Sequence, residues 1–213
     1  MPFYLRISNM GKRWLSEHKQ DAYYKKAKKD GYRSRAAFKL QQLNDRFKLI
    51  KSGDAVIELG AAPGGWSQVI MEMVGNKGFL IGVDLQGIKP IDGMNFIKGD
   101  FTEEETRASM DRIMKKHGRE KVDAVVSDMS PNISGHYSMD QARSIWLAGL
   151  ALDSAKQHLK PGGNFLVKVF EGEDFKPFLD KVKEAFRDVK VHSPSASRKS
   201  SSEVYVAALG FKG

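Results

Sequence analysis

Residues 58–68, ELGAAPGGWSQ, place the strongest constraint on the fold of this chain. An apolar run, Ala55 to Ile57, leads directly into a glycine-rich turn, and a segment of helical character follows. A strand, a tight glycine-rich loop and a helix in this order are typical of nucleotide-binding α/β folds. Such a turn also occurs as a plain connection between strand and helix, so any ligand has to be inferred from neighbouring residues.

The loop departs from the dinucleotide fingerprint at its middle position. It reads G-x-A-x-x-G from Gly60, with Ala62 where a glycine would let the backbone approach a pyrophosphate. A ligand without phosphates fits this loop better. Asp84 ends the next apolar run, about 20 positions after the loop, where a carboxylate can accept both hydroxyls of a ribose. Asp100 ends the following strand-like run and can accept from an adenine amino group, although such a residue is otherwise a turn residue. We therefore predict an adenosine-containing cofactor, S-adenosylmethionine rather than NAD.

Alternating strand-like and helix-like segments predict an α/β fold with a doubly wound, mostly parallel, Rossmann-like sheet. Strands are expected over Ala55–Leu59, Gly78–Asp84, Asn95–Ile97, Val122–Ser127, Asn164–Phe170, Val189–Val191 and Glu203–Leu209. Helices are expected over Lys12–Lys29, Ser34–Phe47 (capped by Ser34), Gly65–Val74, Glu103–His117, Ser138–Leu159 and Phe175–Phe186.

Positive charge is concentrated in the first quarter of the chain. The net charge is +9; residues 1–51 hold 14 Lys and Arg against 4 Asp and Glu, whereas the remainder holds 21 against 22. Tyrosine and phenylalanine interleave with these cations, a pattern that offers charges to phosphates and rings to bases, although a solvated basic helix face has the same composition. We predict a basic, helical RNA-binding appendage over residues 1–51 and one domain over residues 52–213. The predicted RNA contacts are Lys25, Lys28, Lys29, Arg33, Arg35, Arg198 and Lys199.

Composition excludes several classes of site. The chain has no cysteine, which excludes disulfides, thiolate catalysis and cysteine zinc sites, and its five histidines show no metal-ligand spacing. Neither an apolar run of membrane-spanning length nor a secretory signal pattern is present. We expect a cytoplasmic monomer with no metal and no membrane partner.

Two charged residues follow or interrupt predicted central strands. Lys168 lies within NFLVKVF, and Asp128 follows the predicted strand that ends at Ser127. Ligands of open α/β sheets bind at the carboxyl ends of the strands, where both residues are expected. An ion pair that only joins neighbouring strands is the structural alternative, but buried pairs are costly and cluster at functional sites.

Several segments together resemble the FtsJ-type (RrmJ-like) ribosomal RNA 2′-O-methyltransferases. They are YRSRAAFKL at 32–40, ELGAAPGGWSQ at 58–68, DMSPN at 128–132, VKVF at 167–170, SR at 197–198 and SEVY at 202–205. They follow the family order over nearly the whole chain, with Glu58 and Ser130 as small departures. The resemblance implies a seven-stranded S-adenosylmethionine-dependent methyltransferase fold and a Lys-Asp-Lys-Glu tetrad, which falls on Lys39, Asp128, Lys168 and Glu203.

The resemblance implies 2′-O-methylation of a uridine in large-subunit (23S) ribosomal RNA, with that RNA or the large ribosomal subunit as partner. Lys168 is the candidate general base, Asp128 would orient it, and Glu203 would hold Lys39 or the hydroxyl. Two alternatives stay open: a tRNA anticodon-loop ribose methyltransferase, to which AYYKKAKKDGYRSR is similar, and a non-catalytic RNA-binding ribosome-assembly module. The predicted cofactor contacts are Gly60, Ala61, Ala62, Pro63, Gly64, Gly65, Trp66, Asp84, Leu85, Asp100, Phe101 and Asp128.

Overall fold

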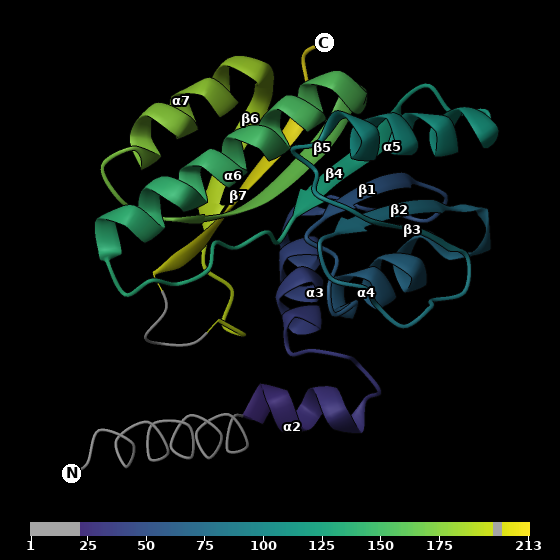
Figure 1. Ribbon diagram of the computed structural model, residues 1–213, viewed down its shortest axis with the longest axis horizontal. Helices are drawn as coiled ribbons and strands as arrows, with labels where there is room; N and C mark the ends of the chain where they lie inside the picture. Colours follow the sequence, from purple (N-terminus) through teal and green to yellow (C-terminus); the bar gives the residue numbers. More distant parts are fainter. Residues whose placement is uncertain (1–21, 198–201) are drawn as a thin grey trace.

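The computed structural model describes residues 22–197 and 202–213, which form a seven-stranded sheet in the order β3-β2-β1-β4-β5-β7-β6 (Figure 1). Strands β1 to β5 pair in parallel, and β7 runs antiparallel to both of its neighbours. The predicted doubly wound, mostly parallel seven-stranded sheet is confirmed. The strands are β1 (Ala55–Leu59), β2 (Phe79–Asp84), β3 (Met94–Lys98), β4 (Val122–Ser127), β5 (Leu159–Phe170), β6 (Phe186–His192) and β7 (Glu203–Phe211).

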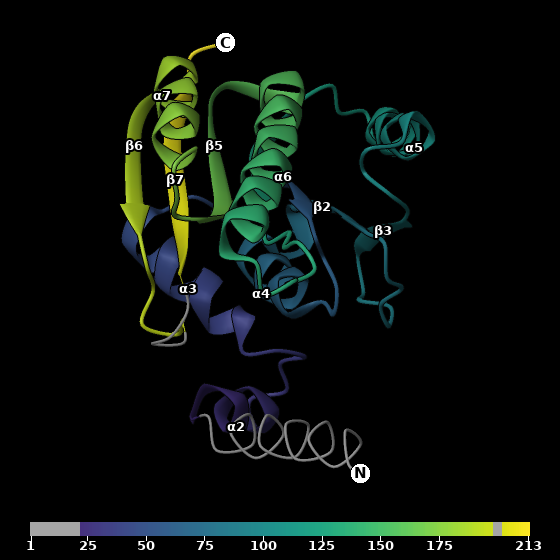
Figure 2. The same cartoon turned by 60° about the vertical axis from the view of Figure 1, so that its left-hand side comes forward.

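Helices cover both faces of the sheet, with α3 and α4 on one face and α5, α6 and α7 on the other (Figures 1 and 2). Side chains alternate along a strand, so Val56 faces α3 and α4 whereas Ile57 faces the opposite layer. Every residue of β1 is buried as a result, including Glu58. The helices are α2 (Ala22–Lys29), α3 (Ala36–Phe47), α4 (Gly65–Val74), the 3₁₀ turn η1 (Gly75–Lys77), α5 (Glu104–Lys116), α6 (Tyr137–His158) and α7 (Phe175–Ala185).

Two strands differ from the prediction by more than two residues at one end. Strand β5 begins at Leu159, which pairs with Val122, and the register then shifts so that Ala124 pairs with Asn164. The intervening Pro-Gly-Gly turn is therefore an irregularity inside one strand. Strand β6 is longer than the three residues expected. The part of the predicted 12–29 helix that the structure describes is helical as α2, and residues 12–21 lie outside the described part of the chain.

The prediction that Ser34 caps helix α3 is wrong. Arg35 occupies the N-cap position with helical backbone angles, and no side chain there bonds to the helix. The Ser34 hydroxyl is buried and has no hydrogen-bond partner among the described residues. It lies instead against Gly65, where an added Cβ would come within 2.2 Å of it. Close packing of α3 on α4 has displaced the capping bond.

Helix α3 belongs to the packed core. Its residues Ala37, Leu40 and Leu43 are fully buried in the same apolar cluster as Val56. The following turn is also tied down, because the Asn164 amide donates to the Leu49 carbonyl at 2.9 Å. The predicted domain boundary at residue 51 therefore falls inside this packed unit, whereas α2 lies at the foot of the molecule (Figure 1).

Candidate active site

The glycine-rich loop lies at the carboxyl edge of the sheet, beside the point between β1 and β4 where the strand order reverses. The Gly60 amide donates to the Val83 carbonyl at 2.9 Å, and the Asp128 amide donates to the Leu59 carbonyl at 3.1 Å. Gly60 has a φ of +80°, and a Cβ there would lie 2.7 Å from the Met129 amide nitrogen. The loop after β4 can approach the glycine loop only because position 60 has no side chain.

A cavity of about 550 Å³ opens at this edge, a volume that suits a small-molecule ligand. Three aspartates contribute to its lining, which contains neither lysine nor arginine in the part of the chain that the structure describes. An acidic lining favours a cationic ligand and disfavours a phosphate. The lining residues are Gly60, Ala62, Pro63, Val83, Asp84, Leu85, Gln86, Gly99, Asp100, Phe101, Thr102, Asp128, Met129, Ser130, Asn132, Leu147 and Leu150.

Two of these aspartates accept hydrogen bonds from residues of the surrounding loops. The Asp84 carboxylate accepts from the amides of Ala62 and Gln86, each at 2.8 Å. The Asp100 carboxylate accepts from the Thr102 hydroxyl at 2.7 Å and from its amide at 2.8 Å, and these bonds lower the pKa of Asp100. Asp100 is therefore ionised and both carboxylates are oriented at the cavity wall.

Eight of the twelve predicted cofactor residues line the cavity, and four do not: Ala61, Gly64, Gly65 and Trp66. The structure places Trp66 in the core, where its indole nitrogen donates to the Ala36 carbonyl at 2.8 Å. Helix α4 begins at Gly65, so the chain turns away from the cavity there. Sequence reasoning missed the α6 residues Leu147 and Leu150, because apolar residues of a helix give the same pattern whether they line a cavity or fill a core.

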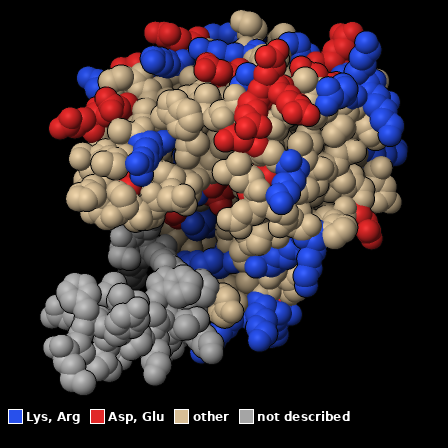
Figure 3. Space-filling view, viewed as in Figure 1, with Lys and Arg blue, Asp and Glu red and all other residues tan. Residues whose placement is uncertain are grey.

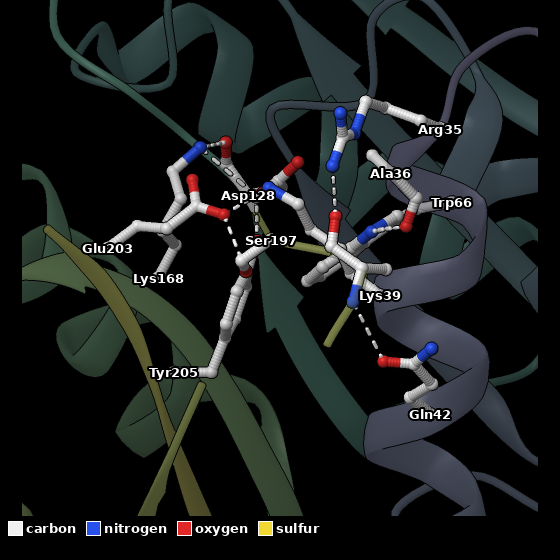
Figure 4. A network of polar contacts seen from close by, with 11 residues as sticks. Arg35, Ala36, Lys39, Gln42, Trp66, Asp128, Lys168, Ser197, Glu203 and Tyr205 are labelled. Atoms are coloured by element: carbon white, nitrogen blue, oxygen red, sulfur yellow. Dashed lines mark hydrogen bonds and ion pairs between the residues drawn. The ribbon is translucent and has the colours of Figure 1, made fainter. Parts of the chain in front are cut away.

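The four residues of the predicted tetrad come from α3, from the end of β4, from β5 and from the start of β7, and the structure joins them as two ion pairs (Figure 4). Lys168 Nζ lies 3.0 Å from Asp128 Oδ1 and donates to the Asp128 carbonyl at 2.6 Å. Lys39 pairs with Glu203. Antiparallel pairing of Phe170 with Glu203 brings the start of β7 to this edge.

Hydroxyl groups support both pairs. The Tyr205 hydroxyl donates to Asp128 Oδ1 at 3.0 Å, and burial raises the pKa of Tyr205 well above its ordinary value, so it stays a donor. Burial would by itself raise the pKa of Glu203, but the Lys39 ammonium and the Ser197 hydroxyl, at 2.9 Å, outweigh burial and lower it. Tyr205 was overlooked as a site residue, although its place two positions after Glu203 puts both side chains on one face of β7.

A buried carboxyl group lies beneath the glycine loop. Glu58 is fully buried; the Ser67 hydroxyl donates to its Oε2 at 2.6 Å, and its Oε1 has no hydrogen-bond partner among the described atoms. Burial raises the pKa of Glu58 to about 8, and the nearby carboxylates of Asp128 and Asp84 add to the effect. The carboxyl group is therefore mostly protonated at neutral pH.

The predicted RNA contacts fall into three groups. Lys25, Lys28 and Lys29 are exposed on α2, and Figure 3 shows Lys and Arg gathered below a central hollow, where Figure 1 draws α2 and α3. Arg33 and Arg35 instead donate to backbone carbonyls, Arg33 to Lys89 and Pro90 and Arg35 to Ala196. Arg198 and Lys199 lie outside the described residues.

Over the ranges described, no helix is long and apolar enough to cross a membrane. The described Asp, Glu and His side chains form no group of three or more that could hold a metal ion.

Comparison with solved structures identifies the class of protein. A chain named as a ribosomal RNA methyltransferase of Plasmodium falciparum superposes with a TM-score of 0.76 at 27% sequence identity, covering 85% of this chain and 100% of its own. Fibrillarin of Aeropyrum pernix, solved with natively bound S-adenosylmethionine, shares the fold with a TM-score of 0.54 at 19% identity, over 84% of this chain and 75% of its own. The fold is that of the methyltransferases.

The sequence profile of the FtsJ-like methyltransferases matches residues 32–211, and the chain belongs to this family. As a member of it, the protein is a methyltransferase that uses S-adenosylmethionine. Two relatives carry the name ribosomal RNA large subunit methyltransferase E. The protein of Methanobrevibacter smithii is 50% identical over 205 residues, 95% of this chain and 96% of its own, and that of Chromobacterium violaceum 47% identical over 203 residues, 95% and 98%. The resemblance inferred from the motifs is confirmed.

Proposed function

We propose that this methyltransferase transfers a methyl group to the ribose 2′-hydroxyl of a uridine in large-subunit ribosomal RNA. The names of the two relatives support the RNA class. One observation carries the proposal: Asp128 belongs both to the lining of the acidic cavity and to the ion pair with Lys168. A methyl donor in the cavity and a hydroxyl beside Lys168 would therefore meet at one residue.

The acidic cavity fits S-adenosylmethionine, which carries a positively charged sulfonium and an ammonium group. Asp84 would accept from the ribose hydroxyls, and Asp100 from the adenine amino group. The cofactor supplies a methyl group that is already electrophilic, so the protein has to align the acceptor oxygen and remove its proton.

Lys168 is the proposed general base. Its neutral amine would accept the proton of the 2′-hydroxyl as the oxygen bonds to the methyl carbon and the bond from that carbon to the sulfonium sulfur breaks, which would leave a neutral thioether. The resulting ammonium would be stabilised by Asp128, whose Oδ1 and main-chain oxygen lie 3.0 and 2.6 Å from Lys168 Nζ. Tyr205 would keep that carboxylate oriented. The Lys39–Glu203 pair would position the acceptor nucleotide beside it.

The exposed lysines of α2 would bind the RNA backbone. Lys25, Lys28 and Lys29 are exposed on the short helix α2, and exposed cations attract phosphates with a strength that falls as salt rises. The protein would thus separate its charges, with a basic surface for the RNA and an acidic cavity for the cofactor.

The test is to incubate the protein with S-adenosylmethionine labelled in the methyl group and, separately, with large ribosomal subunits, free large-subunit RNA and tRNA. Alkali does not cleave beside a 2′-O-methylated ribose, so digestion maps the modified nucleotide. We expect label at a uridine ribose of large-subunit RNA and none with the matched Lys168→Ala variant. Label confined to tRNA would replace the proposed substrate, and S-adenosylmethionine binding without any transfer would favour the non-catalytic module.

A further inference from the structure

The Arg33 side chain bridges two loops, each of which contributes other residues to the lining of the cavity. Its Nη1 donates to the Lys89 carbonyl at 2.6 Å, and its Nη2 donates to the Pro90 carbonyl at 2.8 Å. Both carbonyls belong to the loop 85–93 that joins β2 to β3. On its other side Arg33 lies against the glycine loop. It packs so close to Gly64 that a Cβ atom added there would lie 2.7 Å from Nη1 and 3.0 Å from Cδ.

Arg33 is itself anchored to helix α4. Its main-chain amide donates to Gln68 Oε1 at 2.8 Å, and Gln68 Nε2 donates to the Gly31 carbonyl at 3.0 Å. One glutamine thus holds the turn on both sides of Arg33. Because α4 starts directly after the glycine loop, the arginine has a fixed base from which it reaches the loop 85–93.

The loop 85–93 has little packing of its own. Most of its residues are exposed, and Leu85, which lines the cavity together with Gln86, is 65% exposed. Ile91 provides an apolar contact with the glycine loop, since its Cδ1 lies 3.3 Å from the Cβ position of Gly64. A loop with few buried contacts opens readily unless specific bonds hold it. The two hydrogen bonds from Arg33 hold this loop closed.

We propose that Arg33 is a positioning residue for the cofactor cavity. It holds the loop 85–93 against the glycine loop. The inference rests on the proposed assignment of the cavity to the methyl donor. Arg33 was predicted from sequence to contact RNA, but each of its terminal nitrogens donates to a carbonyl of this loop. The planar fork of arginine spans two adjacent carbonyls, and lysine, with one nitrogen on a flexible stem, cannot reproduce that geometry.

The test compares Arg33→Lys, which keeps the charge and loses the fork, with Lys29→Gln, which removes a cation from an exposed position of the same segment. Three quantities are measured on the full chain: amide hydrogen exchange, without cofactor, of Gln86 and Met94, whose amides donate to Asp84 and Ile91; the Kd of S-adenosylmethionine by calorimetry; and the Kd of large-subunit ribosomal RNA. For Arg33→Lys we expect exchange at least about fivefold faster, a cofactor Kd raised about three- to thirtyfold, and RNA binding within about twofold of wild type. Lys29→Gln should show the opposite pattern.

Exchange and cofactor Kd both at wild-type values in Arg33→Lys would overturn the proposal, and a loss of RNA affinity alone would make Arg33 an RNA contact. Should that variant fail to fold, Arg33→Met, which keeps most of the stem, provides the same comparison. None of these readouts needs methyl transfer, so a wrong RNA substrate leaves the inference standing. A wild-type protein that does not bind S-adenosylmethionine would refute the cofactor assignment instead.

Discussion

Replacing Glu58 with glutamine should change how the stability of the protein depends on pH. The ordinary pKa of a glutamate is near 4.5, and burial raises that of Glu58 to about 8. Between these two values the folded chain keeps a proton that the unfolded chain has released. The stability that this carboxyl group contributes is therefore complete below about pH 4.5 and is lost as the pH rises through about 8.

The size of the effect follows from the shift. Each unit between the two pKa values corresponds to about 1.4 kcal/mol, so wild type should lose about 3 kcal/mol by pH 7 and about 5 kcal/mol above pH 9, relative to pH 4. Glutamine is neutral and close in shape to the protonated acid, and its oxygen can accept the same bond from Ser67. Glu58→Gln should thus match wild type near pH 4.5 and exceed it increasingly above that.

Denaturant unfolding of both proteins at intervals from pH 5 to pH 8 gives the two free energies of unfolding. All other titrating groups are shared, so the difference isolates Glu58. The exposed Glu173 offers a matched control. The difference in unfolding free energy between Glu173→Gln and wild type should not change with pH over this range. If the free-energy difference between wild type and Glu58→Gln also stays constant within about 1 kcal/mol from pH 5 to 8, Glu58 is not protonated in the folded state.

Three further predictions concern the site. Lys168→Ala should reduce single-turnover methyl transfer about 10²- to 10⁴-fold with cofactor affinity retained, and Lys168→Arg should fail as well because arginine stays protonated; a near-normal rate in the arginine variant would leave Lys168 as an orienting cation. Asp84→Ala should weaken S-adenosylmethionine binding by about 1–3 kcal/mol in calorimetry, and unchanged affinity would remove Asp84 from the site. Replacing Lys28 and Lys29 together with glutamine should weaken RNA binding and lower its logarithmic salt slope by about 1.4 to 1.8; identical binding at every salt concentration would reduce both lysines to a solvated helix face.

Local patterns predicted most of the fold and eight of the residues that line the cavity. Asp84 and Asp100 were identified because each ends an apolar run, and the ends of parallel strands share one edge of a sheet. Local patterns did not predict that Trp66, which follows the glycine loop, lies in the core and not in the cavity lining. The local sequence does not show at which residue α4 begins, and side chains from that point on lie away from the cavity.

Contacts that depend on the position of β7 were beyond local patterns, and only the family resemblance placed Glu203 beside Lys39. The pairing of Lys39 with Glu203 depends on β7 entering the sheet antiparallel between β5 and β6, and alternation of elements does not indicate that placement. Arg33 lies in a basic, aromatic segment whose composition favours nucleic-acid binding. Only the structure shows that its terminal nitrogens donate to the Lys89 and Pro90 carbonyls. Charge patterns predict that a cation is present but not what it touches.

The placement of β7 also decides when during synthesis the protein can become active. Strand β7 carries both Glu203 and Tyr205. It lies between β5 and β6 and pairs antiparallel with each of them. A nascent chain that ends before residue 203 has the glycine loop and the acidic aspartates, yet it lacks half of one ion pair and leaves two strand edges unpaired. With the role proposed for Glu203, methyl transfer has to wait until β7 has left the ribosome. A shorter nascent chain would lack that carboxylate and would expose two strand edges that favour aggregation.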